Sequence, residues 1–198
     1  MALARIREIA VLLLAVALAG CAASKNPIGP ASEAVAEPRL AGTWVSDGGS
    51  DNRWEYLHIL PGKDDKQLLI VAVNEGDQSW AVLDAYVTAV QGHRFINLRL
   101  TAADAELMAD VDKTGHKDSH PYSFAAYAFD GDDGLSVGNL VELLYKAVKD
   151  GHLAGETSGD YDVFVADGSD KIAAFLGALD DATLLKQPKH YRRIKSPP

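Results

Sequence analysis

Two histidines and an aspartate lie close together in the segment His116-Lys117-Asp118-Ser119-His120. Imidazole and carboxylate groups are ligands of first-row metals, so this segment is the best local candidate for a metal site. Its spacing matches no known catalytic metal motif, and Pro121 interrupts the backbone directly after it. We therefore expect a solvated loop here and no metal site.

Two acidic runs are candidates for a calcium site. Asp130-Gly131-Asp132-Asp133-Gly134 contains carboxylates but lacks the alternating aspartates and the distal glutamate of a calcium-binding loop. Glycines and aspartates between two apolar runs indicate a hairpin turn instead. The cluster Asp47–Asp51 is likewise expected to be a turn, and we expect no metal or cofactor.

Catalytic motifs are absent from the sequence. It contains no nucleophile elbow, no HExxH, no paired CxxC and no phosphate-binding glycine loop. Scattered serine, histidine and aspartate side chains could converge only in the folded chain. We therefore expect no catalytic residues and a protein that is not an enzyme.

The single cysteine, Cys21, closes a segment typical of an export signal. Arg5 and Arg7 precede the uninterrupted apolar run 9–18, and the small residues Ala19 and Gly20 follow it. A membrane span needs about 20 apolar residues, and this run is roughly half that length. The pattern predicts a signal peptide over residues 1–20, cleaved between Gly20 and Cys21.

The run Leu18-Ala19-Gly20-Cys21 resembles the lipobox of bacterial lipoprotein precursors. The resemblance implies a covalent diacylglycerol on the Cys21 thiol and an N-acyl chain, such as palmitate, on its new amino group. Because each buried methylene adds roughly 0.8 kcal/mol, two or three acyl chains anchor a protein firmly to membrane lipid. An exported chain would then carry no free thiol, which suits an oxidising compartment.

The residue after the lipidated cysteine helps to sort lipoproteins in Gram-negative bacteria, where aspartate favours the inner membrane. Here that residue is Ala22. By this resemblance the protein is expected on the periplasmic face of the outer membrane if its source has two membranes. The alternative is an ordinary secretory signal followed by an unmodified cysteine.

Residues 21–38 are rich in alanine, serine, proline, glycine and glutamate, a composition that predicts a flexible lipidated tether. Residues 39–198 are expected to form one β-rich globular domain with a hydrophobic core. The formal net charge of −9 and the lack of a basic aromatic stripe argue against a nucleic-acid partner.

Alternating or continuous apolar runs separated by turn residues predict a series of strands. The runs are 54–60, 68–73, 80–90, 95–100, 122–129, 135–140, 161–166 and 190–194. Helical spacing of apolar residues predicts two late helices, one after Asn139 and one after Ser169. The expected fold is mainly β (α+β), an antiparallel barrel or curled sheet with two late helices.

Gly42-Thr43-Trp44, at the expected start of the sheet, resembles the Gly-x-Trp signature of lipocalins and related calycin barrels. The resemblance implies that Trp44 plugs one end of a barrel and that Arg192 or Arg193 packs over its ring. Gly159-Asp160-Tyr161 is similar to the family's Thr-Asp-Tyr turn. The alternative is an ordinary strand start with a core tryptophan.

Aromatic side chains on the expected strands fit either a solid core or a ligand-lined barrel, and a core is favoured. They are Trp54, Tyr56, Trp80, Tyr86, Phe124, Tyr127 and Phe129. The first functional hypothesis is an envelope lipoprotein that binds a small apolar ligand or an envelope component. The second is a structural lipoprotein that docks a protein partner through a sheet edge or the helix at 140–148, and the third is an enzyme.

Overall fold

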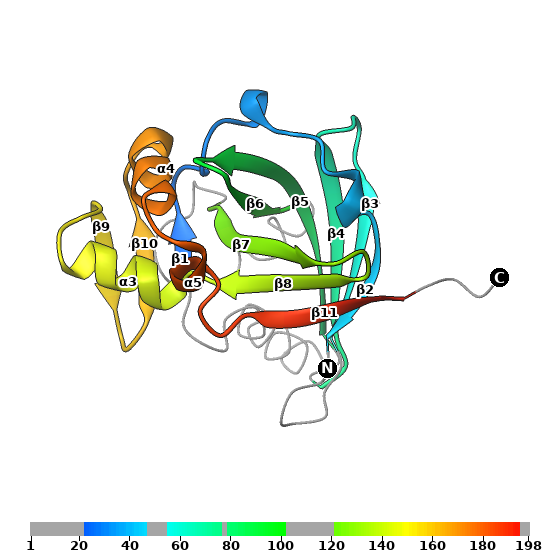
Figure 1. Cartoon of the computed structure of the whole chain (residues 1–198). Helices are drawn as coiled ribbons and strands as arrows, with labels where there is room; N and C mark the ends of the chain where they lie inside the picture. Colours follow the sequence, from blue (N-terminus) through cyan, green and yellow to red (C-terminus); the bar gives the residue numbers. More distant parts are fainter. Residues whose placement is uncertain (1–21, 47–54, 77–78, 102–120, 195–198) are drawn as a thin grey trace.

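The computed structural model describes residues 22–46, 55–76, 79–101 and 121–194. Eight strands form a closed antiparallel barrel in the order β11, β2, β3, β4, β5, β6, β7, β8 (Figure 1). Their bounds are β2 Gly42–Ser46, β3 Glu55–Pro61, β4 Gln67–Asn74, β5 Ser79–Val90, β6 His93–Leu100, β7 Ser123–Asp130, β8 Gly134–Asn139 and β11 Lys189–Ile194. The predicted antiparallel barrel is confirmed.

The last strand closes the barrel. Tyr191 in β11 lies opposite Ser46 of β2 on one side and opposite Leu135 of β8 on the other. The remaining barrel strands pair as consecutive hairpins from β2 to β8. Because every barrel strand has two neighbours, its backbone groups are paired and the barrel has no free edge.

The two ends of the barrel differ in their connections. At one end, β3 runs to β4, β5 to β6 and β7 to β8 through short links, and Gln91, Gly92 and Gly131 adopt positive φ angles in two of them. We call this the plug end, because β2 also begins there with Gly42 and Trp44. The far end is where β3, β5, β7 and β11 begin.

A satellite layer covers the outer wall of β6 and β7 (Figure 1). It contains a three-stranded sheet in the order β1, β10, β9 and the helices α3, α4 and α5. Their bounds are β1 Ala22–Ser24, α3 Val141–Lys149, β9 Gly155–Ser158, β10 Asp162–Val165, α4 Ser169–Gly177 and α5 Asp181–Leu184. The two predicted late helices are α3 and α4.

The satellite explains why the apolar pattern of β6 is irregular. Ile96 faces the barrel interior, whereas Phe95 faces outward and is nevertheless fully buried. Phe95 packs with Ala126 of the neighbouring strand β7 and with satellite side chains. These are Leu140, Leu144, Val163, Val165, Ile172 and Leu176. Both faces of this part of the wall are therefore apolar, which strict alternation cannot describe.

The prediction of a flexible tether over residues 21–38 is wrong for residues 22–38. β1 pairs in parallel with β10, and Val35 bridges Val87 of β5. Two short 3-10 helices, η1 Ala31–Glu33 and η2 Pro38–Leu40, follow. Ser24, Ile28 and Leu40 are fully buried. Few but well-placed apolar side chains, together with backbone pairing, fix this segment despite its loop-like composition.

Asn97 holds the N-terminal segment on the outer wall of β6. Its Oδ1 accepts the Ile28 backbone N–H at 2.7 Å, and its Nδ2 donates to Thr88 Oγ1 at 3.1 Å and to the Ile28 carbonyl at 3.4 Å. Asn97 and Ile28 are buried. Without Asn97, the buried Ile28 N–H would have no hydrogen-bond partner and no access to water. The Asn97 side chain is therefore an internal anchor for the segment.

We expect Asn97→Ala to lower the free energy of unfolding by about 1 to 3 kcal/mol, because it leaves buried backbone groups of Ile28 without partners. Urea denaturation measures the change. Asn74→Ala is the control, since Asn74 Oδ1 accepts only an exposed bond from Gly76 N. Equal losses in the two variants would contradict the anchoring role of Asn97.

Candidate ligand site in the barrel

Trp44 lies inside the barrel near the end at which β2 begins. Its side chain is fully buried, and its indole N–H donates to the Leu40 carbonyl at 2.8 Å. The Arg193 guanidinium lies 4.1 Å from the centroid of the Trp44 ring. Arg193 also donates to the carbonyls of Ala41, at 2.5 Å, and Arg39. The guanidinium thus ties β11 to the chain entering β2 and gains a cation–π contact.

Gly42 is required by the same arrangement. Its φ is +136°, which side chains rarely allow, and an added Cβ would lie 2.5 Å from Arg193 Nη1. The structure therefore brings Gly42, Trp44 and Arg193 together. Arg192 does not join them, because neighbouring strand residues point to opposite faces and Arg192 is exposed on the outside.

The second segment that resembles lipocalins is not part of the barrel. Gly159-Asp160-Tyr161 occupies the turn between β9 and β10 in the satellite, not a turn of the barrel. Gly159 has a positive φ of 55°, which suits a tight turn. The similarity of this segment to the family's Thr-Asp-Tyr turn therefore does not extend to its position in the fold.

Two further aromatic rings pack near Trp44 in the plug-end half of the barrel. The centroid of Phe129 lies 6.3 Å from that of Trp44 and 5.6 Å from that of Tyr127. The Arg39 guanidinium covers the Phe129 ring at 4.0 Å. Burial raises the pKa of Tyr127, so its hydroxyl stays protonated in the folded protein. This half of the interior is a packed aromatic core.

Of the seven aromatic positions singled out in the sequence, Tyr127 and Phe129 face the interior. Phe124 packs under the satellite, and the Tyr86 hydroxyl donates to the Gly29 carbonyl outside the barrel at 3.1 Å. Tyr56 and Trp80 lie on the outer wall, and Trp54 lies outside the described residues. Most of these aromatics are therefore not ligand-lining groups.

Burial of the inward-facing apolar side chains changes along the barrel. Ile59, Ile70, Ile96 and Leu135, in the half nearer the plug, are at most 5% exposed. Their counterparts toward the far end are only half-buried although they belong to the same interior cluster. These are Leu57, Leu83, Leu98 and Val137. Partly exposed interior side chains are therefore more frequent toward the far end, although Phe129 at the plug end is also half-buried and Tyr191 at the far end is only 6% exposed.

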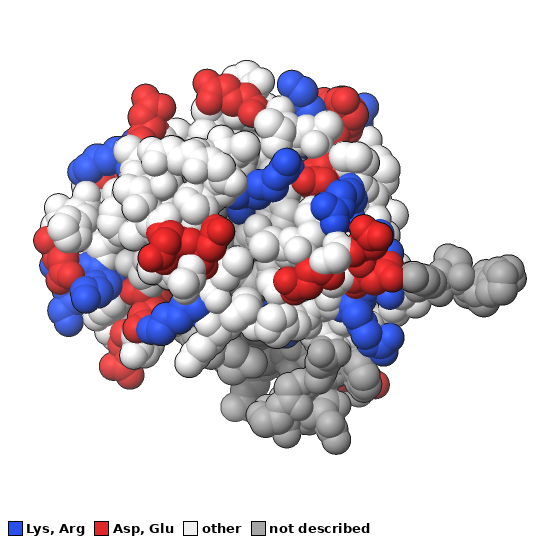
Figure 2. Space-filling model, in the orientation of Figure 1, with Lys and Arg blue, Asp and Glu red and all other residues white. Residues whose placement is uncertain are grey.

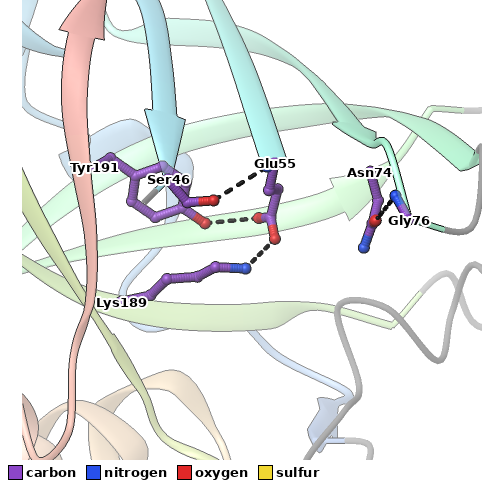
Figure 3. Close-up of polar contacts among 6 residues, drawn as sticks. All are labelled: Ser46, Glu55, Asn74, Gly76, Lys189 and Tyr191. Atoms are coloured by element: carbon purple, nitrogen blue, oxygen red, sulfur yellow. Dashed lines mark hydrogen bonds and ion pairs between the residues drawn. The ribbon is translucent and has the colours of Figure 1, made fainter. Parts of the chain in front are cut away.

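Polar side chains gather on the inner surface at the far end (Figure 3). The Tyr191 hydroxyl donates to Glu55 Oε1 at 2.6 Å, and the Lys189 ammonium pairs with Glu55 Oε2. The Glu55 backbone N–H donates to Ser46 Oγ at 3.0 Å. Strand alternation explains why Lys189, Tyr191 and Arg193 share the inner face of β11.

The electrostatics of this far-end cluster suit hydrogen bonding rather than proton transfer. Burial and the adjacent Glu55 carboxylate raise the pKa of Tyr191 well above its usual range, so the hydroxyl remains a donor. The Glu55 side chain is 19% exposed and Lys189 49% exposed. An entering molecule would meet a carboxylate, an ammonium and a hydroxyl above an apolar wall.

The metal candidates lie elsewhere. Segments 116–120 and 47–51 are outside the described residues, and Asp130 to Gly134 forms the link between β7 and β8 at the plug end. Among residues 22–46, 55–76, 79–101 and 121–194, no three His, Cys, Asp or Glu side chains are grouped so as to hold a metal.

One Ser-His-Asp grouping was missed in the sequence. On the outer wall, Ser136 Oγ lies 2.5 Å from Asp130 Oδ2 and 2.9 Å from His190 Nδ1. Both partners contact the serine, and His190 Nδ1 is 3.7 Å from Asp130 Oδ2. A nucleophilic serine needs histidine as its base and aspartate behind the histidine. Ser136 is also buried, so this geometry indicates a structural bond between β7, β8 and β11.

The residues of the lipobox resemblance, including Gly20 and Cys21, lie outside the described part of the chain, as does the rest of segment 1–20. In the part that is described, none of the helices has the length and apolar character needed to cross a membrane. Comparison of the chain with protein families, with curated proteins and with solved structures finds no match. The closed eight-stranded barrel is compatible with a lipocalin-like binding module.

Proposed function

We propose that the protein is a membrane-anchored envelope lipoprotein whose barrel binds a small, mainly apolar ligand. The observation that carries the binding proposal is the set of half-buried apolar side chains in the interior cluster toward the far end, Leu57, Leu83, Leu98 and Val137. Binding sites of this kind combine an apolar lining with a few placed polar groups. The far-end cluster supplies those polar groups.

An amphiphile fits this combination best. Its apolar part would replace water beside Leu57, Leu83 and Leu98, and about 25 cal/mol is gained per Å² of apolar surface removed from water. Its polar end would exchange hydrogen bonds with Glu55, Lys189 or Tyr191. Because the cluster carries both charges, it favours a polar head group without selecting strongly for one sign.

The plug supports binding by keeping the scaffold rigid. Trp44, Arg193 and η2 are tied together at one end by the indole bond to Leu40, the ring contact of Arg193 and its bond to Ala41. A preformed site binds without the cost of ordering its own walls. We place ligand exchange at the far end.

Surface charge supports a lipid anchor over an electrostatic one and argues against nucleic acid as a partner. On the face seen in Figure 2, lysine and arginine side chains are interspersed with aspartate and glutamate and form no continuous basic patch. With a net charge of −9, the chain repels both phosphate backbones and anionic lipid.

Docking of a protein partner is the less favoured alternative. Closure of the barrel leaves it no free edge for strand addition. The apolar stripe of the α3 helix, Val141, Leu144 and Ala147, is buried inside the satellite. The barrel wall and the apolar stripe of α3 are thus occupied within the chain, and the exposed edge strand β9 of the satellite sheet is the surface that remains for a partner.

We expect Cys21→Ser to abolish membrane anchoring, because serine provides no thiolate to accept a diacylglyceryl group. The measurement is incorporation of labelled palmitate together with flotation of the protein with membranes. Ala22→Ser is the control and should behave as the natural chain. Normal flotation and labelling of Cys21→Ser would refute the anchor.

A further inference from the structure

Four large hydrophobic side chains are exposed among the described residues, and the two aliphatic ones lie at the plug end whereas the two aromatic ones do not. Leu60, 48% exposed, and Ile194, 41% exposed, lie at the plug end of β3 and β11. Trp80, 59% exposed, is the second residue of β5 and lies at the far end. Tyr161, 47% exposed, lies in the satellite before β10. The two aromatic side chains are thus separated from the two aliphatic ones.

The point at which the proposed anchor joins the fold is also fixed near the far end. The Ser123 hydroxyl, on the first residue of β7, donates to the Ala22 carbonyl at 3.1 Å. Ser24 exchanges two backbone hydrogen bonds with Tyr122, both at 2.8 Å. Ala22 directly follows Cys21 in the sequence, so no further residue separates the proposed anchor from this fixed point.

Tyr161 lies beside this attachment point. β1 and β10 run parallel, with Ala22 opposite Val163, so the starts of both strands lie at one edge of the satellite sheet. Tyr161 immediately precedes β10, and its ring contacts that of Tyr145 at 5.8 Å. An aromatic side chain with an exposed face is therefore held next to the residue that follows the anchor.

The far-end rim continues this surface around the barrel. Tyr56, Val73 and Trp80 lie side by side in register on the outer wall of β3, β4 and β5. Between Trp80 and the attachment point, the Arg99 guanidinium lies 5.6 Å from the centroid of the Tyr122 ring. Aromatic rings and arginine are the side chains that settle at the boundary between lipid and water.

We propose that the far end of the barrel docks on the bilayer surface through Trp80, Tyr161 and the rim between them, with the plug end pointing away from the membrane. This orientation rests on the proposed function, because the acyl chains on Cys21 supply the attachment. It places the entrance to the ligand site against lipid. An apolar ligand then passes between the bilayer and the barrel without crossing open water.

The test uses the full lipidated protein on phosphatidylcholine vesicles that contain a nitroxide-labelled lipid as quencher. One added cysteine, in Trp80→Cys, Tyr161→Cys or Leu60→Cys, carries an environment-sensitive fluorophore. Because acylation blocks Cys21, only the added thiol is labelled. Leu60 is the matched control, since it is about as exposed as Tyr161. Positions 60 and 80 are also well separated along the barrel wall. Leu60 lies opposite Leu69 and Trp80 lies opposite Val73, and these two residues of β4 are four positions apart, about 13 Å along the strand.

We expect the nitroxide lipid to remove most of the fluorescence at positions 80 and 161 and little of it at position 60. Quenching at position 60 equal to that at 80 and 161, or no quenching at 80 and 161 on vesicles that carry the protein, overturns the orientation alone. A protein that does not float with the vesicles overturns the anchor and the orientation together. All three side chains are exposed, so their replacement leaves the core unchanged.

Discussion

Trp44→Ala should lower the free energy of unfolding by about 3 to 5 kcal/mol, the range found when a large aromatic side chain is removed from a core. Trp44 is fully buried, its indole N–H bonds to Leu40, and Arg193 covers its ring. The variant loses this burial and both contacts, and it leaves a cavity at the plug end. It also leaves the Arg193 guanidinium without its ring.

Urea denaturation followed by circular dichroism measures this loss. Trp80→Ala is the control, because Trp80 is 59% exposed and its removal should change the free energy of unfolding by no more than about 0.5 kcal/mol. Similar losses in the two variants would show that Trp44 is not the plug of the barrel.

Ala72→Trp should weaken binding of a neutral apolar probe, such as N-phenyl-1-naphthylamine, by at least about tenfold, or 1.4 kcal/mol. Ala72 lies opposite Leu57 on β3 and Ala81 on β5, in the half of the interior toward the far end. An indole at this position occupies the space in which the apolar part of a ligand would lie. Ala72 itself is half-buried, so the added ring lies beside other partly exposed side chains.

Val71→Trp is the matched control for this experiment. Val71 is the preceding residue, so its side chain points to the outer wall while Ala72 points inward. Fluorescence titration should give the natural affinity for Val71→Trp and the reduced affinity for Ala72→Trp. An unchanged affinity in Ala72→Trp would place the probe outside the barrel.

Individual hairpins could be predicted from the sequence where short turns join two strands, but the run 161–166 belongs to the satellite sheet and not to the barrel. Glycine and aspartate between Phe129 and Leu135, for example, indicated the hairpin of β7 and β8, and this local signal is sufficient. Closure of the barrel could not be derived in this way. Closure depends on the pairing of β11 with β2, in which Arg193 lies opposite Trp44. These residues are 149 positions apart in the sequence, and turn residues predict only the pairing of strands that follow each other directly.

The choice between Arg192 and Arg193 illustrates a signal that was available. Tyr191 is large and partly apolar, so it belongs on the inner face of a closing strand, and alternation then places Arg193 on that face as well. The same alternation brings Lys189 inside, although its partner Glu55 is far away in the sequence. The far-end cluster therefore became evident only in the folded chain.

Composition misled the prediction for residues 22–38. Alanine, serine and proline are typical of linkers, but the segment also contains Ile28, whose burial depends on one distant side chain, Asn97. Hydrogen bonds of this kind leave no periodic pattern. An N-terminal segment fixed in this way brings the proposed lipid anchor close to the entrance of the proposed ligand site.

Native mass spectrometry of the protein extracted from membranes tests the central claim most directly. We expect the natural chain to carry a noncovalent apolar or amphiphilic ligand in addition to the covalent acyl groups on Cys21, and Ala72→Trp to carry the acyl groups alone. A natural chain without any bound ligand, or an Ala72→Trp protein that retains the same ligand, would contradict the assignment of the barrel interior as a binding site.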